Sequence, residues 1–328
     1  MKKCRSIGSP LFFLFTCVKD GRKYIGRLFD SLLSQTNTNF VHYIYDDGSK
    51  EPLDEMVDEY KNKVARLKKP YRVIYEKNPI NLGLNLSTKH CIDVCNLQFF
   101  IWIDCDNWID SLFFEEMEKA VARHPDAILI RSKLLNQTGQ DAAIYSKKFK
   151  KERQKKQIKN FFYNSFAHGF FCVNKDYYLQ INKDNYFFEE KGFYNDEQVI
   201  LTSMLSNKNF YFCEKAIGYF LERKDSESAT YAQQSIDYYF NLFEKLIARY
   251  NKTFADQVQF IKYLRISFNE MDALKRTDPK KSIKIYFERL NVIKKQKISR
   301  QFRYRRKNGL YWLLALLYCR IRYGSRAK

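Results

Sequence analysis

Gln98-Phe-Phe-Ile-Trp-Ile-Asp104-Cys105-Asp106 is the stretch that decides the fold of this chain. Its apolar part has the length of a buried strand, and helical patterns lie on either side of it. Two carboxylates follow where the strand would leave the sheet, and open α/β sheets bind ligands at the carboxyl ends of their strands. Asp104 and Asp106 are hard oxygen ligands that suit Mg²⁺ or Mn²⁺, with waters and ligand phosphates completing the shell. The alternative is a turn in which Asp106 and Asn107 cap the next helix.

The first half of the chain alternates strand and helix patterns around this run. Such alternation predicts βαβ units with right-handed crossovers and a mostly parallel sheet. A polar, basic stretch over 137–160 interrupts the pattern, and we expect a loop there. We predict an α/β domain over residues 1–225 and a helical, basic region over 226–328. The predicted strands are 11–18, 40–45, 72–75, 99–103, 127–131, 210–213 and 216–221, and the predicted helices are 22–35, 53–67, 84–95, 111–123 and 194–206.

The composition of the 328 residues is that of a globular protein, with 45% hydrophobic and 29% charged residues. The eight cysteines form no C-x-x-C pair and most lie in apolar runs, which is typical of free thiols in a reducing compartment. The four histidines show no paired spacing, which argues against a zinc site. The apolar run 11–18 is too short for a signal peptide, and no apolar run is long enough to span a membrane. We therefore expect a cytoplasmic protein.

The net charge of +21 is concentrated at the C-terminal end, where Lys275–Lys328 holds 18 Lys and Arg against two acidic residues. Within this tail, 308–323 is an apolar run with Trp312 near its start and basic clusters on both sides. Such a segment predicts a helix lying on an anionic membrane surface, peripheral on the inner face. The alternatives are a helix packed on the sheet or on a second copy in a homo-oligomer, and a tail that binds nucleic acid.

Two further motifs follow predicted strands. Asp46-Asp47-Gly48-Ser49 ends the second strand, and an acceptor-only carboxylate there suits the N–H of a pyrimidine or the hydroxyls of a ribose. Asn81-Leu82-Gly83 lies between the third strand and a helix, where glycine lets backbone approach a ligand. A plain turn and a plain loop-to-helix junction are the respective alternatives. Lys89, in the helix that follows, is either a cation for a phosphate or a solvated lysine.

A pair of carboxylates opens the helix predicted at 194–206. Asp196 and Glu197 would lie in its first turn, where the helix dipole favours negative charge. The functional interpretation is a general base, which needs one carboxylate within hydrogen-bond reach of an acceptor hydroxyl.

The order of these motifs resembles the inverting glycosyltransferases of family 2, which have the GT-A fold. Gly83 and Asp104 are 21 positions apart, which is similar to the spacing in that family. The resemblance covers about residues 8–222 and implies a GT-A fold, an α/β architecture with a Rossmann-like mixed sheet. It also implies a nucleotide-sugar donor, with a UDP-sugar expected, and an acceptor hydroxyl on a glycan or lipid-linked glycan in surface polysaccharide synthesis.

The resemblance implies roles for individual donor-binding positions. Asp46 matches the carboxylate that binds uracil, and Thr16 and Val18 match the segment whose backbone frames the base. Asp104 matches the position near the ribose and the metal, and Asp106 matches the direct metal ligand. The residues expected to bind the nucleotide sugar are thus Thr16, Val18, Asp46, Asp47, Asn81, Gly83, Lys89 and Asp104.

The resemblance also implies a catalytic base and shows three departures from the family. Asp196 matches the base of the family's E-D motif, with Glu197 as the fallback. The motif's glutamate is replaced by Asn195. The family's Ala-Arg-Asn is replaced by Ser87-Thr88-Lys89, and its diphosphate-binding His or Arg has Arg223 and Lys224 as the nearest candidates. The rival functions are a basic nucleic-acid- or membrane-binding protein and a GT-A scaffold without catalysis.

Overall fold

The computed structural model describes residues 10–140, 170–187, 195–204, 206 and 208–223, together with positions 245, 246, 248, 249, 278, 281 and 284. The chain divides into two compact units, Met1–Asn251 and Lys252–Lys328. All helices and strands named below belong to the first unit. Residues 141–160 of the expected loop and the tail helix 308–323 lie outside the described residues, as do nearly all positions of the predicted helical region 226–328. The predicted boundary at residue 225 stays a prediction.

The described part of the first unit is built around one sheet with the strand order β3-β2-β1-β4-β7-β6-β8-β5. Its strands are β1 (Phe12–Val18), β2 (Phe40–Asp47), β3 (Arg72–Asn78), β4 (Phe99–Trp102), β5 (Trp108–Ile109), β6 (Ala127–Asn136), β7 (Phe171–Asn174) and β8 (Asn209–Phe220). The helices are α1 (Arg22–Leu33), α2 (Asp54–Arg66), α3 (Leu84–Val94), α4 (Phe113–Arg123), α6 (Lys175–Ile181) and α7 (Asn195–Met204). The predicted α/β class with a mixed sheet is confirmed.

The sheet has a parallel half and a mixed half. Strands β3, β2, β1 and β4 pair in parallel, as βαβ units require. Strand β7 then pairs antiparallel with both β4 and β6, and β5 pairs antiparallel with β8. The expectation of a mostly parallel sheet therefore holds for the N-terminal half only.

Two predicted strands proved to be one. The segments expected at 210–213 and 216–221 form the single strand β8, which pairs with β6. Its register shifts between Ser132, opposite Cys213, and Lys133, opposite Ile217, so the polar residues that suggested a break form a bulge. The short strand β5 was not predicted, because two residues carry no periodic pattern.

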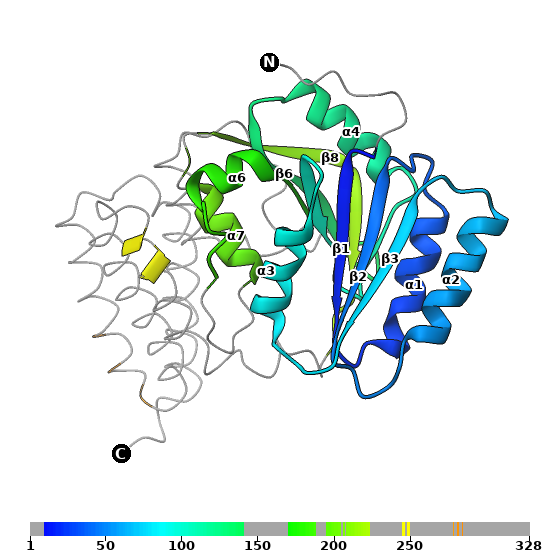
Figure 1. Cartoon of the computed structure of the whole chain (residues 1–328). Helices are drawn as coiled ribbons and strands as arrows, with labels where there is room; N and C mark the ends of the chain where they lie inside the picture. The colour runs from blue at the N-terminus through cyan, green and yellow to red at the C-terminus, as the bar shows by residue number, and fades with distance from the viewer. Residues whose placement is uncertain are drawn as a thin grey trace, which may run out of the picture. The chain divides into compact units, whose positions relative to one another are not determined.

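Helices cover both faces of the sheet, with α1 and α2 on one side and α3, α6 and α7 on the other (Figure 1). A hydrophobic core cluster lies under α1, α2 and α4, and aromatic rings fill much of it. Phe40 stacks on both Phe114 and Tyr71, with ring centroids 4.2 and 4.4 Å apart. Because the central strands are buried on both faces, their sequences are almost continuously apolar, with His42 inside β2 as an exception and the two aspartates at the end of that strand.

Candidate functional site

The carboxyl ends of β1, β2 and β4 meet at one edge of the sheet. Val18 pairs with Asp46 in the register of β1 and β2, and Phe15 pairs with Trp102 in the register of β1 and β4. The Ile103 amide donates to the Phe15 carbonyl at 3.2 Å, so the chain that leads to Asp104 continues beside β1. The structure thus brings the motifs predicted after β1, β2 and β4 to the same edge.

Thr16 and Val18 lie in the predicted strand end with their side chains inside the protein. Thr16 is fully buried, and its hydroxyl lies 3.2 Å from Nε2 of His42. Burial lowers the pKa of His42 to about 3, so this imidazole is neutral at physiological pH. Because the side chains of Thr16 and Val18 face the interior, these two residues can contact a ligand at the edge only through their backbone, and their role in framing the base stays a prediction.

Asp46 is fully buried at the end of β2 and is held by two donors. Its Oδ1 accepts from the Ser49 amide at 2.8 Å, and its Oδ2 accepts from the Tyr75 hydroxyl at 3.1 Å. Burial and, to a smaller extent, the negative charge of Asp46 raise the pKa of Tyr75 above its usual range. The phenol therefore keeps its proton and stays a hydrogen-bond donor. Tyr75 was not among the predicted residues, since one tyrosine in a strand carries no signal. Binding of a base by Asp46 stays a prediction.

Asp47 connects β2 to the Asn81-Leu82-Gly83 loop. One carboxylate oxygen accepts from the Leu82 amide and the other from the Gly83 amide, both at 2.8 Å. Gly83 has φ +89° and open space where a Cβ would lie, so glycine supplies the conformation and leaves the backbone uncovered. Asn81 is exposed, and its Oδ1 also accepts from the Gly83 amide at 2.9 Å. The loop lies at the start of α3, as predicted.

The β1–α1 turn is bound to the turn after β2. The Lys19 ammonium donates to the Gly48 carbonyl at 2.7 Å, and the Asp20 amide donates to the Ser49 hydroxyl at 2.9 Å. The Lys50 amide donates to Asp20 at 2.7 Å and lowers the pKa of that carboxyl. The two turns therefore form one connected border around the strand ends.

The Asp104-Cys105-Asp106 stretch forms a turn at the end of β4. Asp104 is exposed, its carbonyl accepts from the Asn107 amide at 3.0 Å, and its carboxylate accepts from the Asn107 side chain at 3.3 Å. A Cβ atom on Gly21 would lie only 2.5 Å from the Cys105 sulfur. The β1–α1 turn therefore packs directly on this stretch. The turn of the alternative is therefore present, but its capping role is wrong, because β5 follows and the N-cap position of α4 is Leu112.

Asp106 forms an ion pair with Arg223, whose guanidinium nitrogen lies 2.7 Å from Oδ2. The same guanidinium lies over the Tyr24 ring, 4.3 Å from its centroid. Arg223 was one of the two candidates for the missing family cation, and its contact with Asp106 places it at this site. Tyr24 was not predicted, and no pattern in the sequence would have identified it.

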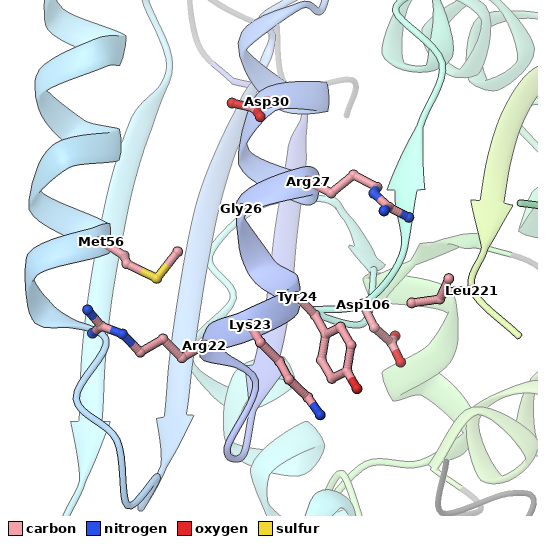
Figure 2. A pocket seen from close by; sticks show the side chains of 9 residues that line it. All are labelled: Arg22, Lys23, Tyr24, Gly26, Arg27, Asp30, Met56, Asp106 and Leu221. Carbon is pink, nitrogen blue, oxygen red and sulfur yellow. The ribbon is translucent and has the colours of Figure 1, made fainter. Parts of the chain in front are cut away.

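A cavity of about 360 Å³ opens beside Asp106. Figure 2 shows α1 in the middle of its lining, with Met56 of α2 on one side and Asp106 and Leu221 on the other. Three cations of α1 line it, together with two carboxylates. The lining residues are Arg22, Lys23, Tyr24, Gly26, Arg27, Asp30, Met56, Asp106 and Leu221.

The predicted metal ligands agree in kind with Mg²⁺ or Mn²⁺. In the part of the chain that the structure describes, no group of three or more His, Cys, Asp or Glu side chains is arranged to hold a metal ion. The protein would therefore contribute Asp104 and Asp106, and water and diphosphate oxygens would complete the shell, as is usual for Mg²⁺. The ion pair with Arg223 is compatible with this, since a carboxylate can accept an arginine on one oxygen and coordinate a cation with the other.

The predicted base and the predicted phosphate-binding lysine lie on α7 and α3. Asp196 follows Asn195 at the start of α7 and is half-buried, and the side chain of Glu197 lies outside the described residues. The Asn195 amide donates to the Thr88 hydroxyl of α3 at 2.8 Å. The Lys89 ammonium pairs with Asp93, one turn further along α3, at 2.6 Å. That pair agrees with the alternative in which Lys89 is a solvated helix lysine. Binding of a phosphate by Lys89 stays a prediction.

The described residues contain no helix that is long and apolar enough to cross a membrane.

Comparison with solved structures shows what the fold is similar to. The N-terminal region of TarS from S. aureus (residues 1–349), solved with UDP-GlcNAc, aligns with a TM-score of 0.64 and 17% identity over 85% of this chain and 79% of TarS 1–349. The same region solved with UDP aligns with a TM-score of 0.61 and 18% identity, over 81% and 75% of the two chains. At these identities the likeness concerns the fold alone, and it agrees with the predicted GT-A architecture.

Sequence comparison points the same way. EpsH of Bacillus subtilis (strain 168), whose name places it among the glycosyltransferases, is 26% identical over 121 residues. That match covers 37% of this chain and only 33% of EpsH. The family model "Glycosyl transferase family 2" matches residues 14–180, about half of the chain, and spans the strand ends that carry Asp46, Asp47, Asp104 and Asp106. This chain belongs to glycosyl transferase family 2.

Proposed function

We propose that this protein is a metal-dependent inverting glycosyltransferase that moves a sugar from a UDP-sugar to a hydroxyl of a glycan or lipid-linked glycan. The observation that carries the proposal is the shared edge at which Asp46, Asp47, Asp104 and Asp106 meet, in a chain of this family. TarS 1–349 was solved in complex with UDP-GlcNAc, and this nucleotide sugar is therefore the first donor to test.

The chain's own residues would divide the binding of the donor among them. The backbone of the β1 end, beside the buried Asp46 carboxylate that fixes the turn after β2, would frame the base. The uncovered Gly83 backbone would approach the donor at the start of α3. Arg223 is ion-paired with Asp106, and its guanidinium would donate to a diphosphate oxygen of a donor bound at this carboxylate. A divalent cation on Asp106 and Asp104 would offset the negative charge that develops on the leaving UDP.

Asp196 would act as the general base. It would accept the proton of the acceptor hydroxyl while that oxygen bonds to the anomeric carbon and the bond from that carbon to the diphosphate oxygen breaks. Attack from the face opposite the diphosphate inverts the configuration in one displacement. Asp196 belongs to α7, whereas the proposed metal ligands follow β4, so separate elements supply the two carboxylate roles.

The basic C-terminal region would hold the enzyme at an anionic membrane surface. The 18 Lys and Arg of Lys275–Lys328 would each add about 1 kcal/mol of attraction when close to the surface. A lipid-linked acceptor would then be presented to the site.

The test is a panel of nucleotide sugars incubated with the full chain and Mn²⁺ and scored for UDP release and for binding. We expect turnover of one UDP-sugar. Asp196→Asn should bind UDP with wild-type affinity and lose about 10²–10⁴-fold in turnover. Turnover of Asp196→Asn at the wild-type rate would show that the base is wrong. Salt-dependent retention on DNA, with no turnover of any nucleotide sugar, would replace the proposal with nucleic-acid binding.

A further inference from the structure

The residue that replaces the glutamate of the family's E-D motif makes a buried contact between two helices. The Asn195 side-chain amide, on α7, donates to the Thr88 hydroxyl, on α3, at 2.8 Å. Asn195 is 5% exposed and Thr88 is 1% exposed. A buried amide and hydroxyl that satisfy each other fix the relative placement of the two helices, since breaking the bond would leave both groups without that partner in a dry environment.

The start of α3 is itself bound to the donor edge. Asp47, at the end of β2, accepts from the amides of Leu82 and Gly83, both at 2.8 Å. The Gly83 carbonyl then accepts from both the amide and the hydroxyl of Ser87, each at 3.0 Å. Thr88 is the next residue. A continuous series of hydrogen bonds and helical backbone therefore leads from the β2 carboxylate to the start of α7.

We propose that Asn195 and Thr88 are a positioning pair that sets the Asp196 carboxylate relative to the donor. The inference rests on the proposed function, because it assigns Asp196 the role of base. Asp196 follows Asn195 directly in the first turn of α7, so a shift of Asn195 moves the base with it. A neutral amide suits this position, because a buried carboxylate there would carry a desolvation cost and add a like charge beside the base.

A second asparagine offers a matched control. The Asn185 side-chain amide also reaches α3, where it donates to the Lys89 carbonyl at 3.1 Å and to the Asp93 carboxylate at 2.9 Å. It is ten positions before Asn195 and not adjacent to the base. Its φ of +45° suits glycine, so Asn185→Gly removes the contact without backbone strain. Loss of a buried asparagine contact on α3 can thus be separated from loss of the Asn195 contact.

The experiment measures kcat, KM and UDP affinity of the full chain with Mn²⁺ and the donor identified by the panel. Asn195→Ala and Thr88→Val should each lower kcat by about ten-fold, and by up to about 100-fold if the base moves by 1 Å. Donor KM and the Kd for UDP should stay within about two-fold, because neither Asn195 nor Thr88 is among the residues proposed to contact the donor. Thr88→Ser, which keeps the hydroxyl, should restore most of kcat. The double variant Asn195→Ala/Thr88→Val should lose no more than the worse single variant, since both remove one bond.

Asn185→Gly should keep kcat near the wild-type value even where its thermal midpoint falls as far as that of Asn195→Ala. Wild-type kcat in Asn195→Ala would overturn the proposal, and so would additive losses in the double variant or an equal loss of UDP affinity. If the wild-type chain turns over no nucleotide sugar, the proposed function fails and this inference fails with it. If the wild type is active and Asn195→Ala matches it, only the positioning role fails.

Discussion

The carboxylates after β2 and those after β4 share one edge of the sheet, and they are held in different ways. Asp46 is fully buried and Asp47 is 3% exposed, and both accept hydrogen bonds on both of their oxygens, from the neighbouring loops and, for Asp46, also from Tyr75 of β3. Asp104 is exposed, and Asp106 shares an ion pair with Arg223 beside an open cavity. The first pair is built into the fold. The second pair lies at the surface, where a ligand can reach it.

The two sequence motifs look alike, but this difference in burial and hydrogen bonding predicts different roles for them. Both D-D-G-S and D-C-D are turns that carry two aspartates at a strand end. At the β2 end the carboxylates organise the loops that surround the site, and their removal should mainly lower the free energy of unfolding. At the β4 end, removal of the carboxylates should mainly lower the affinity for the ligand.

The largest expected effect is acid destabilisation through the buried β2 region. Burial lowers the pKa of His42 from 6.5 to about 3. Between these two pH values the imidazole is protonated in the unfolded chain and neutral in the folded chain. This contribution to stability is fully present above pH 6.5 and is lost as the pH falls toward 3, by about 1.4 kcal/mol per pH unit and on the order of 5 kcal/mol in all.

Urea unfolding of the wild type and of His42→Gln between pH 7 and 4 measures it. The wild type should lose stability more steeply than the variant. Equal slopes for the two proteins would show that His42 is not kept neutral by the fold.

The next effect is the loss of the β2 carboxylate that binds the α3 loop. Asp47→Ala removes the acceptor of two backbone amides and should lower the free energy of unfolding by about 3 kcal/mol. Asp104→Ala, at the exposed carboxylate, should change it by no more than about 0.5 kcal/mol. Chemical denaturation of both variants measures the contrast. Similar losses in the two variants would abolish the distinction between the two pairs.

The smallest expected effect is a change in Mn²⁺ affinity when Arg223 is replaced. Because its guanidinium lies on Asp106, it opposes a second cation at that carboxylate. Arg223→Gln should therefore bind Mn²⁺ more tightly when no nucleotide is present, by up to about five-fold, which is about 1 kcal/mol. Calorimetric titration with Mn²⁺ alone measures it, and Arg249→Gln, which removes an exposed pair with Asp184, is the control. Weaker Mn²⁺ binding in Arg223→Gln would mean that the arginine supports the cation.

The sequence predicted most of the strands and helices because buried strands and amphipathic helices have distinct periods, as Phe99–Trp102 and Phe113–Arg123 show. It also placed Asp46, Asp47 and Asp104 at one edge, since parallel strands share their carboxyl ends. It could not predict the contact of Arg223 with Asp106 or that of Asn195 with Thr88. These pairs are more than 100 residues apart, and no local pattern records a contact that folding alone creates.

We propose that Asp104-Cys105-Asp106 binds a nucleotide diphosphate through a divalent cation. The most direct measurement is the Kd for UDP of the wild type and of Asp106→Ala, with Mn²⁺ and with EDTA. The wild type should bind UDP at least about ten-fold more tightly with Mn²⁺, and the variant should bind with the same weak affinity in both conditions. A variant that keeps the full Mn²⁺ dependence would contradict the claim.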